Sequence, residues 1–335
     1  MKIVVFEVEE WERSAFDRLK EEHEITFVDD LLTKDNVKQY ADAEVVSPFI
    51  YSDLSSGVLK HLNRLKLIAT RSTGFDHIDL EFCKKNTITV CNVPVYGDNT
   101  VAEHVFGLIL AISHNLIAAV DRTRRGDFSQ TGLRGFDLLG KTLGVIGTGS
   151  IGRCVIEIAK GFRMNVVAFD VKQDDKWANT LGFRYMSMDE LLATSDIITL
   201  HVPSSEKTRN LISGEAFARM KDGVVLINTA RGDIVDVKAL VKAIAEGKVA
   251  AAGLDVLPEE SVIREEAELL YSVYQKRNVL ETLLANHILL HLRNVIITPH
   301  SAFNTREAVE RILNTTAENI ISFIGGNPVN ALVKK

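Results

Sequence analysis

The chain has 335 residues, of which 46% are hydrophobic and 25% charged, a composition typical of globular proteins and not of disordered ones. Because one hydrophobic core rarely serves so long a chain, we expect two domains. The net charge of −6 without a basic tract argues against a nucleic-acid partner, and three scattered cysteines exclude a disulfide framework. Since the sequence shows neither a signal peptide nor an apolar run of about 18–20 residues, we predict a cytoplasmic protein with no membrane partner.

Short apolar runs rich in Val and Ile alternate with helical patterns along the chain. These runs do not alternate with polar residues, which is typical of parallel strands covered by helices on both faces. A first series covers residues 2–8, 24–28, 43–49, 65–70 and 87–93, and a second covers residues 142–147, 165–170, 196–201, 223–228, 249–254 and 294–298. Two such series predict an α/β protein with two doubly wound parallel-sheet domains.

Two long helical patterns indicate where the domains meet. The first covers residues 100–125, where Thr100 is expected to cap the helix and Glu103 lies in its first turn. The second covers residues 305–324 and follows the last predicted strand. We therefore predict that one domain combines residues 1–99 with residues 300–335 and that residues 100–299 form the other.

Residues 261–293 fit this alternation poorly, because they are long for a connection between two strands. Their apolar residues have helical spacing, so we expect a helical segment packed on the surface, with a lid or a partner contact as the alternative. His287 and His291 are one helical turn apart, but they do not form an HExxH motif and no nearby carboxylate stands at a fixed spacing. We predict no metal site.

The segment Gly147-Thr-Gly149-Ser-Ile-Gly152 is a GxGxxG motif between a predicted strand and a predicted helix. The next predicted strand follows the helix, so the motif lies in a βαβ unit of about 30 residues. In such a unit the first glycine permits a tight turn, the second lets the backbone approach a pyrophosphate, and the third lets helix and strand pack closely. The helix N-terminus then favours the anionic pyrophosphate. The motif predicts a dinucleotide site.

Asp170 ends the second strand of this unit and follows Gly152 at the spacing that this kind of motif requires of its acidic residue. At that position a carboxylate accepts hydrogen bonds from the adenosine ribose. No arginine stands nearby, and an acidic side chain would repel a 2′-phosphate. The predicted cofactor is therefore NAD and not NADP.

Further motifs follow other predicted strands: RSTGFDHID at 71–79, VPVYGDNTVAEH at 93–104, DIITLHVP at 196–203, NTARG at 228–232, GLDV at 253–256 and TPHSAF at 298–303. With GTGSIGR at 147–153, their order and spacing resemble the D-isomer-specific 2-hydroxyacid dehydrogenases, most closely the D-lactate dehydrogenase branch. The similarity extends over essentially the whole chain. It implies a flavodoxin-like split substrate domain and a Rossmann NAD-binding domain.

The resemblance implies a catalytic triad of Arg231, Glu260 and His300. Glu260 follows the arginine at the spacing of the family glutamate, although the adjacent Glu259 leaves the assignment open to a shift by one position. A guanidinium forks onto the carboxylate and carbonyl oxygens of a 2-keto acid. An imidazole titrates near neutrality and can exchange a proton with the substrate oxygen, and a neighbouring carboxylate favours its protonated form.

The resemblance also implies binding residues. The expected cofactor contacts are Gly147, Gly149, Ser150, Ile151, Gly152, Asp170, Val202, Pro203, Thr208, Thr229, Ala230, Arg231 and Asp255. Asp255 is expected to reach the nicotinamide carboxamide, with a structural capping role as the alternative. The expected substrate contacts are Thr73, Gly74, Tyr96, Arg231 and Phe303, the first two through backbone N–H groups that bind the carboxylate.

The predicted function is an NAD-dependent D-2-hydroxyacid dehydrogenase, most of all a D-lactate dehydrogenase that reduces pyruvate. A preference for a bulkier 2-keto acid stays open, because nothing in the sequence fixes the pocket volume. An NADH-sensing corepressor of the same fold is the alternative outside enzymes. The resemblance also suggests a homodimer formed through the cofactor-binding domains.

Overall fold

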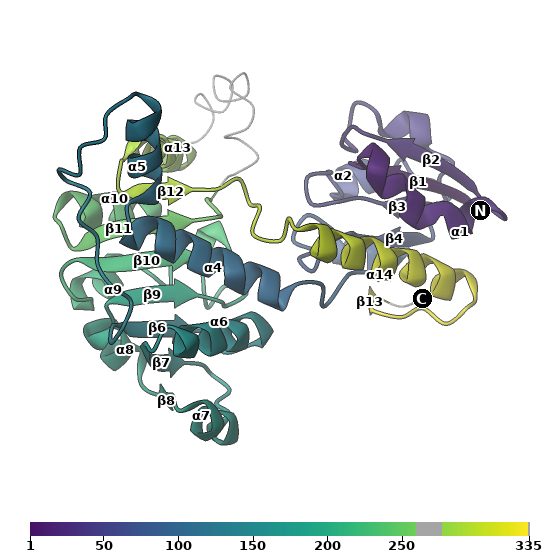
Figure 1. The fold of residues 1–335 in the computed structure, drawn as a ribbon. Helices are drawn as coiled ribbons and strands as arrows, with labels where there is room; N and C mark the ends of the chain where they lie inside the picture. The colour runs from purple at the N-terminus through teal and green to yellow at the C-terminus, as the bar shows by residue number, and fades with distance from the viewer. Residues whose placement is uncertain (259–276, 334–335) are drawn as a thin grey trace. The chain divides into compact units, whose positions relative to one another are not determined.

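The computed structural model describes residues 1–258 and 277–333, with side chains for 1–258 and 281–333. Two compact units make up the chain (Figure 1): Met1–Gly97 together with Asn304–Lys335, here the split unit, and Asp98–Phe303, here the inserted unit. The first boundary lies slightly before the predicted one and the second lies slightly after it. The substrate and cofactor roles predicted for the two domains remain predictions.

The split unit contains one six-stranded sheet with the order β13-β5-β4-β3-β1-β2. Its strands are β1 (Lys2–Phe6), β2 (Glu24–Val28), β3 (Val45–Ser47), β4 (Leu67–Ala69), β5 (Thr89–Cys91) and β13 (Ala331–Val333). The first five pair in parallel, and β13 lies antiparallel to β5 at the edge. Without this edge strand the order is that of the flavodoxin-like doubly wound sheet, as predicted.

Short helices and one long helix pack on this sheet. The described helices are η1 (Glu10–Phe16), α1 (Asp17–Lys20), η2 (Val37–Tyr40), α2 (Ser56–Leu59), α3 (Leu80–Lys85) and α14 (Arg306–Ile324). The Thr305 hydroxyl caps α14 by accepting a hydrogen bond of 3.3 Å from the Ala308 N–H. The apolar face of α14 lies against β4 and η1 (Figure 1), so the C-terminal part of the chain completes the core of the N-terminal part.

The inserted unit contains a seven-stranded sheet with the order β12-β11-β10-β9-β6-β7-β8. Its strands are β6 (Thr142–Ile146), β7 (Asn165–Phe169), β8 (Arg184–Tyr185), β9 (Ile197–Leu200), β10 (Val224–Asn228), β11 (Val249–Leu254) and β12 (Val295–Ile297). All pairs are parallel. This is the Rossmann order, in which the strand sequence reverses between β6 and β9.

Helices cover both faces of the Rossmann sheet, and two apolar clusters lie between helices and strands. The described helices are α4 (Asp98–Ser113), α5 (Leu116–Arg124), α6 (Ser150–Gly161), α7 (Asp175–Leu181), α8 (Met188–Thr194), α9 (Gly214–Arg219), η3 (Gly232–Ile234), α10 (Val237–Ala245) and α13 (Arg277–His291). The predicted helix over 261–293 is helical from Arg277 to His291. The earlier part of that prediction falls outside the described residues.

The prediction of one helix over residues 100–125 is wrong. The helix is interrupted at Asn115, whose φ is +51°, and the axes of α4 and α5 differ by 62°. Ser113 O accepts a hydrogen bond of 2.9 Å from Phe136 N, and the Asn115 amide donates to the carbonyl groups of Leu133 and Arg134. The loop after α5 therefore satisfies backbone groups that a continuous helix would use. Thr100 is not a cap but a buried residue within α4.

Among the described residues, no single helix is long and apolar enough to cross a bilayer. The pair α4 and α5 reaches the required length and composition jointly, although it is bent.

Candidate active site

The glycine loop joins β6 to α6 and is shaped by close packing. Gly147 has φ of +96°, and a Cβ on it would lie 2.5 Å from His201 O. A Cβ on Gly152 would lie 2.1 Å from Gly147 O, so this glycine lets α6 approach the strand. In contrast, a Cβ on Gly149 would meet nothing within 4 Å. The backbone at Gly149 is thus open for a ligand to approach, and Ser150 and Ile151 begin the helix whose free N–H groups suit a pyrophosphate.

Asp170 follows β7 and is tied to this loop. One carboxylate oxygen accepts hydrogen bonds from Thr148 N (2.6 Å) and Thr148 Oγ1 (2.9 Å), and the other accepts one from Lys172 N (2.8 Å). Burial opposes the charge, but these hydrogen bonds prevail and hold the pKa of Asp170 below its usual value. Tyr185 Oη lies 3.0 Å from Thr148 Oγ1. The Asp170 side chain is therefore a fixed anion at the position where a ribose is expected.

The segment after β9 lies next to the glycine loop. Val202 is half-buried and Pro203 is exposed, and the Thr208 hydroxyl donates a hydrogen bond of 2.6 Å to Pro203 O. His201 lies within 2.9 Å of Thr199 Oγ1, and burial lowers the pKa of His201 to about 3. This imidazole is therefore neutral near pH 7 and is unsuited to donate a proton.

Arg231 follows β10 in a turn built by Asn228. The Asn228 carboxamide accepts a hydrogen bond from Ala230 N (3.0 Å) and donates one to Arg231 O (2.8 Å). The guanidinium is half-buried and donates to Ala230 O over 2.8 Å. Thr229 Oγ1 is buried and has no hydrogen-bond partner among the described residues. A buried hydroxyl left over in this turn fits a site that receives a polar ligand.

His300 follows β12 in a turn clamped by Asp255. The Asp255 carboxylate is 1% exposed, accepts hydrogen bonds from Ser301 N and Ala302 N (both 2.9 Å), and accepts another from Thr298 Oγ1. His300 N donates to Asp255 O over 2.9 Å. His300 itself has φ of +53°, so this clamp imposes a backbone conformation that residues other than glycine seldom adopt.

The Asp255 clamp includes a histidine from a distant part of the chain. His104 Nε2 from α4 lies 3.0 Å from Thr298 Oγ1 and 3.5 Å from Asp255 Oδ1. Both Asp255 oxygens thus have partners inside the turn, and a contact with the nicotinamide remains a prediction. Glu260 and Glu259 lie outside the described residues.

Neighbouring strand ends bring these groups to one edge of the inserted unit. β10, β11 and β12 pair side by side, and Arg231, Asp255 and His300 follow their carboxyl ends. Asp255 N donates to Asn228 O over 2.9 Å, which joins the two turns directly. In open α/β sheets this edge is where ligands bind.

In the split unit the turn Ser72–Gly74 follows β4. Ser72 Oγ donates to Gly74 O (2.6 Å), Thr73 Oγ1 donates to Val93 O (2.6 Å), and Asn92 Nδ2 donates to Thr73 O (2.8 Å). Among the described residues, the backbone N–H groups of Thr73 and Gly74 donate no hydrogen bond. A rigid turn with two N–H groups left over is suited to an anion such as a carboxylate.

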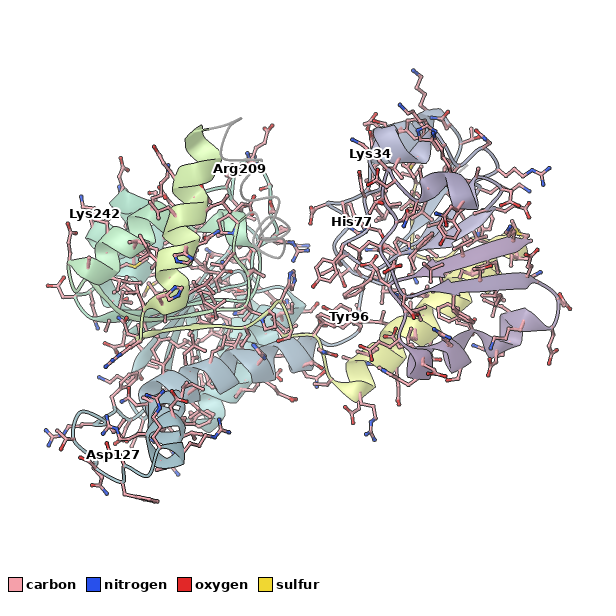
Figure 2. All side chains as sticks on the ribbon, turned by 90° about the horizontal axis from the view of Figure 1, so that it is seen from above. Lys34, His77, Tyr96, Asp127, Arg209 and Lys242 are labelled. Atoms are coloured by element: carbon pink, nitrogen blue, oxygen red, sulfur yellow. The ribbon has the colours of Figure 1, made fainter. Side chains whose placement is uncertain are left out.

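The two aromatic residues expected at the substrate lie in different units. Tyr96 is half-buried in the split unit (Figure 2), where its carbonyl oxygen accepts a hydrogen bond from Arg311 Nε of α14. Phe303 is the last residue of the inserted unit and is also half-buried.

Several supporting residues were not found from the sequence. Asn92 O accepts a hydrogen bond of 2.8 Å from Asn319 Nδ2, and Asn319 Oδ1 accepts one of 2.9 Å from Asn330 Nδ2. Nothing in the sequence around Asn319 marks this role, because a polar residue in a helix is usually exposed. His104 lies inside a quoted motif, but its partners became clear only with the fold.

Comparisons with known proteins agree with this geometry. Residues 106–302 match the family model described as "D-isomer specific 2-hydroxyacid dehydrogenase, NAD binding domain". The D-lactate dehydrogenase of Escherichia coli is 36% identical over 324 residues, with 96% of each chain covered. A 2-hydroxyacid dehydrogenase homolog of Haemophilus influenzae is 35% identical, with 99% of each chain covered.

A solved structure is similar over nearly the whole chain. The D-lactate dehydrogenase of Aquifex aeolicus, solved with NAD and lactic acid, has a TM-score of 0.85 and 36% identity, and the match covers 98% of this chain and 99% of that one. The glycine loop, the anionic Asp170 and the leftover Thr229 hydroxyl fit the same cofactor. This chain therefore belongs to the D-isomer specific 2-hydroxyacid dehydrogenase family and is an NAD-dependent oxidoreductase.

Proposed function

We propose that this enzyme is a D-lactate dehydrogenase, which reduces pyruvate to D-lactate with NADH. The observation that carries the proposal is the pair of turns that places Arg231 after β10 and the clamped His300 after β12, on the two sides of β11 at the ligand-binding edge of the Rossmann sheet. The similarity to the E. coli and A. aeolicus enzymes named D-lactate dehydrogenase supports the choice of substrate.

In the proposed mechanism, bound NADH would supply the hydride for reduction of the keto acid, and NAD⁺ would accept it in the reverse reaction. Arg231 binds the carboxylate and carbonyl oxygens of the keto acid and withdraws charge from the carbonyl group. His300 Nε2 or Nδ1 gives a proton to the oxygen as negative charge develops there, and takes it back during oxidation. Glu260 stabilises the protonated imidazole. The proton transfer depends on the turn that carries His300, whose backbone the Asp255 carboxylate holds.

The split unit is proposed as the substrate domain. Thr73 N and Gly74 N are proposed to bind the substrate carboxylate, because the turn holds both N–H groups in place and leaves them without partners among the described residues. Tyr96 and Phe303 are proposed to contact the methyl group of pyruvate. The inserted unit is proposed to hold NAD through the contacts predicted after β6, β7, β9 and β10, whereas Asp255 after β11 is proposed to hold the turn that carries His300.

Wild-type enzyme with NADH is expected to reduce pyruvate more efficiently than 2-oxobutyrate, 4-methyl-2-oxopentanoate or phenylpyruvate, and the product should be the D-isomer. His300→Ala should lower kcat by about 10²–10⁴-fold, because the proton donor is lost. His287→Ala, which removes an exposed histidine, serves as the control. Steady-state kinetics and chiral analysis of the product check both points. A higher kcat/KM for a bulky 2-keto acid, or an L-product, would contradict the proposed substrate or stereochemistry.

NADH is expected to exceed NADPH in kcat/KM by roughly tenfold or more, because the ionised Asp170 repels a 2′-phosphate. Asp170→Ala should lower the ratio of kcat/KM with NADH to kcat/KM with NADPH. The control is Asp175→Ala, which removes an exposed carboxylate from the first turn of α7. Equal efficiency of the two cofactors in wild-type enzyme, or an unchanged ratio in Asp170→Ala, would show that Asp170 does not discriminate between them.

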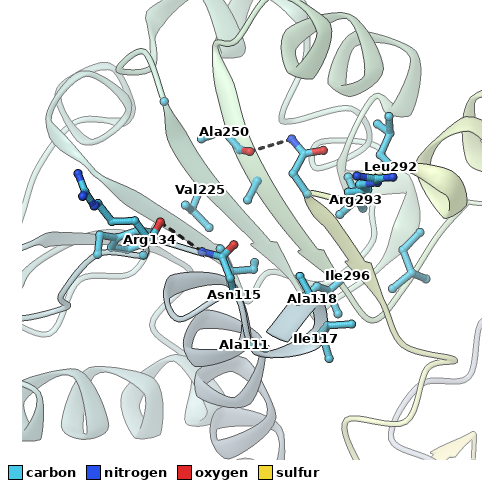
Figure 3. Close-up of a pocket in the computed structure, with 18 of the residues that line it drawn as sticks. Ala111, Asn115, Ile117, Ala118, Arg134, Val225, Ala250, Leu292, Arg293 and Ile296 are labelled. Carbon is cyan, nitrogen blue, oxygen red and sulfur yellow. Dashed lines mark hydrogen bonds between the residues drawn. The ribbon is translucent and has the colours of Figure 1, made fainter. Parts of the chain in front are cut away.

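We also propose that two copies associate through α5 and the loop after it. No residue of α5 is buried, and Ile117 is 60% exposed. Phe128 is 80% exposed on the loop that projects from the inserted unit at Asp127 (Figure 2). Beside α5 lies a hollow of about 1180 Å³ lined by Ile117, Arg134, Leu292 and Ile296 (Figure 3). An exposed apolar surface beside a hollow is typical of a protein interface.

The charges around this hollow favour a second copy as the occupant. Arg122 and Arg125 lie beside Asp121 and Asp127, so the surface carries both signs and can complement itself across a two-fold axis. Sedimentation at micromolar concentration should give a dimer for the wild type and a monomer for Ile117→Glu. Val329→Glu changes a residue of the split unit that is 46% exposed and should leave the dimer intact. A monomeric wild type, or a dimeric Ile117→Glu, would contradict this interface.

A further inference from the structure

Glu7 stands directly after β1 in a left-handed backbone conformation, with φ of +53°. Glycine adopts this conformation freely, whereas a residue with a Cβ does so at a cost in free energy. The buried Arg71 guanidinium holds the conformation, since its Nη2 donates to Phe6 O (2.7 Å) and Glu7 O (2.5 Å). A glutamate at such a position indicates that its side chain is needed.

The Glu7 carboxylate gathers four donors from one loop. Its Oε2 accepts hydrogen bonds from Phe49 N (3.0 Å), Ser52 N (3.2 Å) and Ser52 Oγ (2.5 Å), and its Oε1 accepts one from Tyr51 N (3.0 Å). All four groups are donors, and the two oxygens of a carboxylate can accept from all of them. A carboxamide would replace one of these oxygens by an NH₂ group, which would face an N–H donor of the loop. The carboxylate therefore fixes the backbone of residues 48–52, here the β3 loop.

The β3 loop lies where a ligand is expected in the split unit. β2 lies on one side of β1 and β3 on the other, so the strand order reverses between β1 and β3. In doubly wound sheets, ligands bind outside the carboxyl ends of the strands at this reversal. Arg71 N donates to Pro48 O over 2.9 Å, which joins the loop to the residue directly before the turn Ser72–Gly74, here the carboxylate turn because it is proposed to bind the substrate carboxylate.

The β3 loop carries two aromatic side chains in a fixed arrangement. The rings of Phe49 and Tyr51 are 5.9 Å apart and meet edge to face, and both residues are half-buried. Because Glu7 binds the N–H group of each, the position of this ring pair depends on one carboxylate.

We propose that Glu7 is a positioning residue for the substrate, which holds the β3 loop so that Phe49 and Tyr51 form a wall beside the carboxylate turn and limit the size of the 2-keto acid side chain. This inference rests on the proposed carboxylate site at Thr73 and Gly74. Glu7 does not touch the reacting atoms. Its loss is expected to weaken keto-acid binding and size selection while the cofactor site in the inserted unit stays unchanged.

Two variants separate positioning from backbone stability. Glu7→Gly removes the carboxylate but relieves the left-handed strain, and Glu7→Gln keeps the shape but removes the charge. Thr87→Gly is the matched control, since Thr87 is an exposed residue of the same unit with φ of +56°. If the Glu7 side chain were needed only for the fold, its loss would lower the urea midpoint of unfolding and leave the kinetic constants of the folded enzyme unchanged.

Both Glu7 variants should raise KM for pyruvate roughly tenfold, in line with buried donors left unpaired, with KM for NADH within about twofold of wild type. The ratio of kcat/KM for pyruvate to that for 4-methyl-2-oxopentanoate should fall in both, and Thr87→Gly should match wild type. Folded variants with wild-type KM and ratio would overturn the inference alone. A wild-type enzyme that reduces no 2-keto acid would overturn the proposed function and this inference with it.

Discussion

The buried carboxylate of Asp255 is the constraint on which the candidate site of the inserted unit depends. It joins the end of β11 to the turn after β12 through Ser301 N, Ala302 N and the Thr298 hydroxyl. These hydrogen bonds hold His300 at positive φ, a conformation that costs free energy and persists where the surroundings impose it. The proton transfer proposed for His300 gains from such rigidity, because it requires hydrogen-bond distance between the imidazole and the substrate oxygen.

In the split unit, asparagine carboxamides hold the turn Ser72–Gly74, whereas in the inserted unit a carboxylate holds the turn of His300. Asn92 holds Thr73 O, and the buried Asn319 of α14 holds Asn92 O. The last long helix thus supports a turn formed in the first part of the chain, since Asn92 and Asn319 are 227 positions apart. Asn330 O also accepts a hydrogen bond of 3.2 Å from Asn92 N, so α14 and the segment after it hold Asn92, which in turn holds Thr73.

The sequence predicted the parallel strands well, because continuous apolar runs can be recognised without knowledge of the fold. It missed β8 and β13, which have two and three residues and lack such a run. The break at Asn115 was missed because the group that satisfies Ser113 O is the N–H of Phe136, which comes only after α5 and its loop. Sheet order followed from the family resemblance and not from periodicity.

Candidate site residues that belong to a sequence motif could be predicted. The residues that hold them in place through contacts between distant parts of the chain could not. Gly147, Asp170, Arg231 and His300 stand at strand ends that the apolar pattern marks. The φ of Glu7, the Asp255 clamp and the His104 contact depend on residues far apart in the chain. Such contacts leave no local pattern, since each partner alone is an ordinary polar residue.

The most direct test of whether Asp255 positions His300 is to compare NADH binding and turnover between Asp255→Asn and the wild-type enzyme. The carboxamide cannot accept from all the donors of the turn, so His300 should lose its orientation and kcat for pyruvate should fall by about 10²-fold. The NADH dissociation constant, followed by fluorescence titration, should stay within about twofold of wild type, as in the control Asp222→Asn at an exposed carboxylate. A large loss of NADH affinity with unchanged kcat would instead show that Asp255 serves the cofactor and not the histidine.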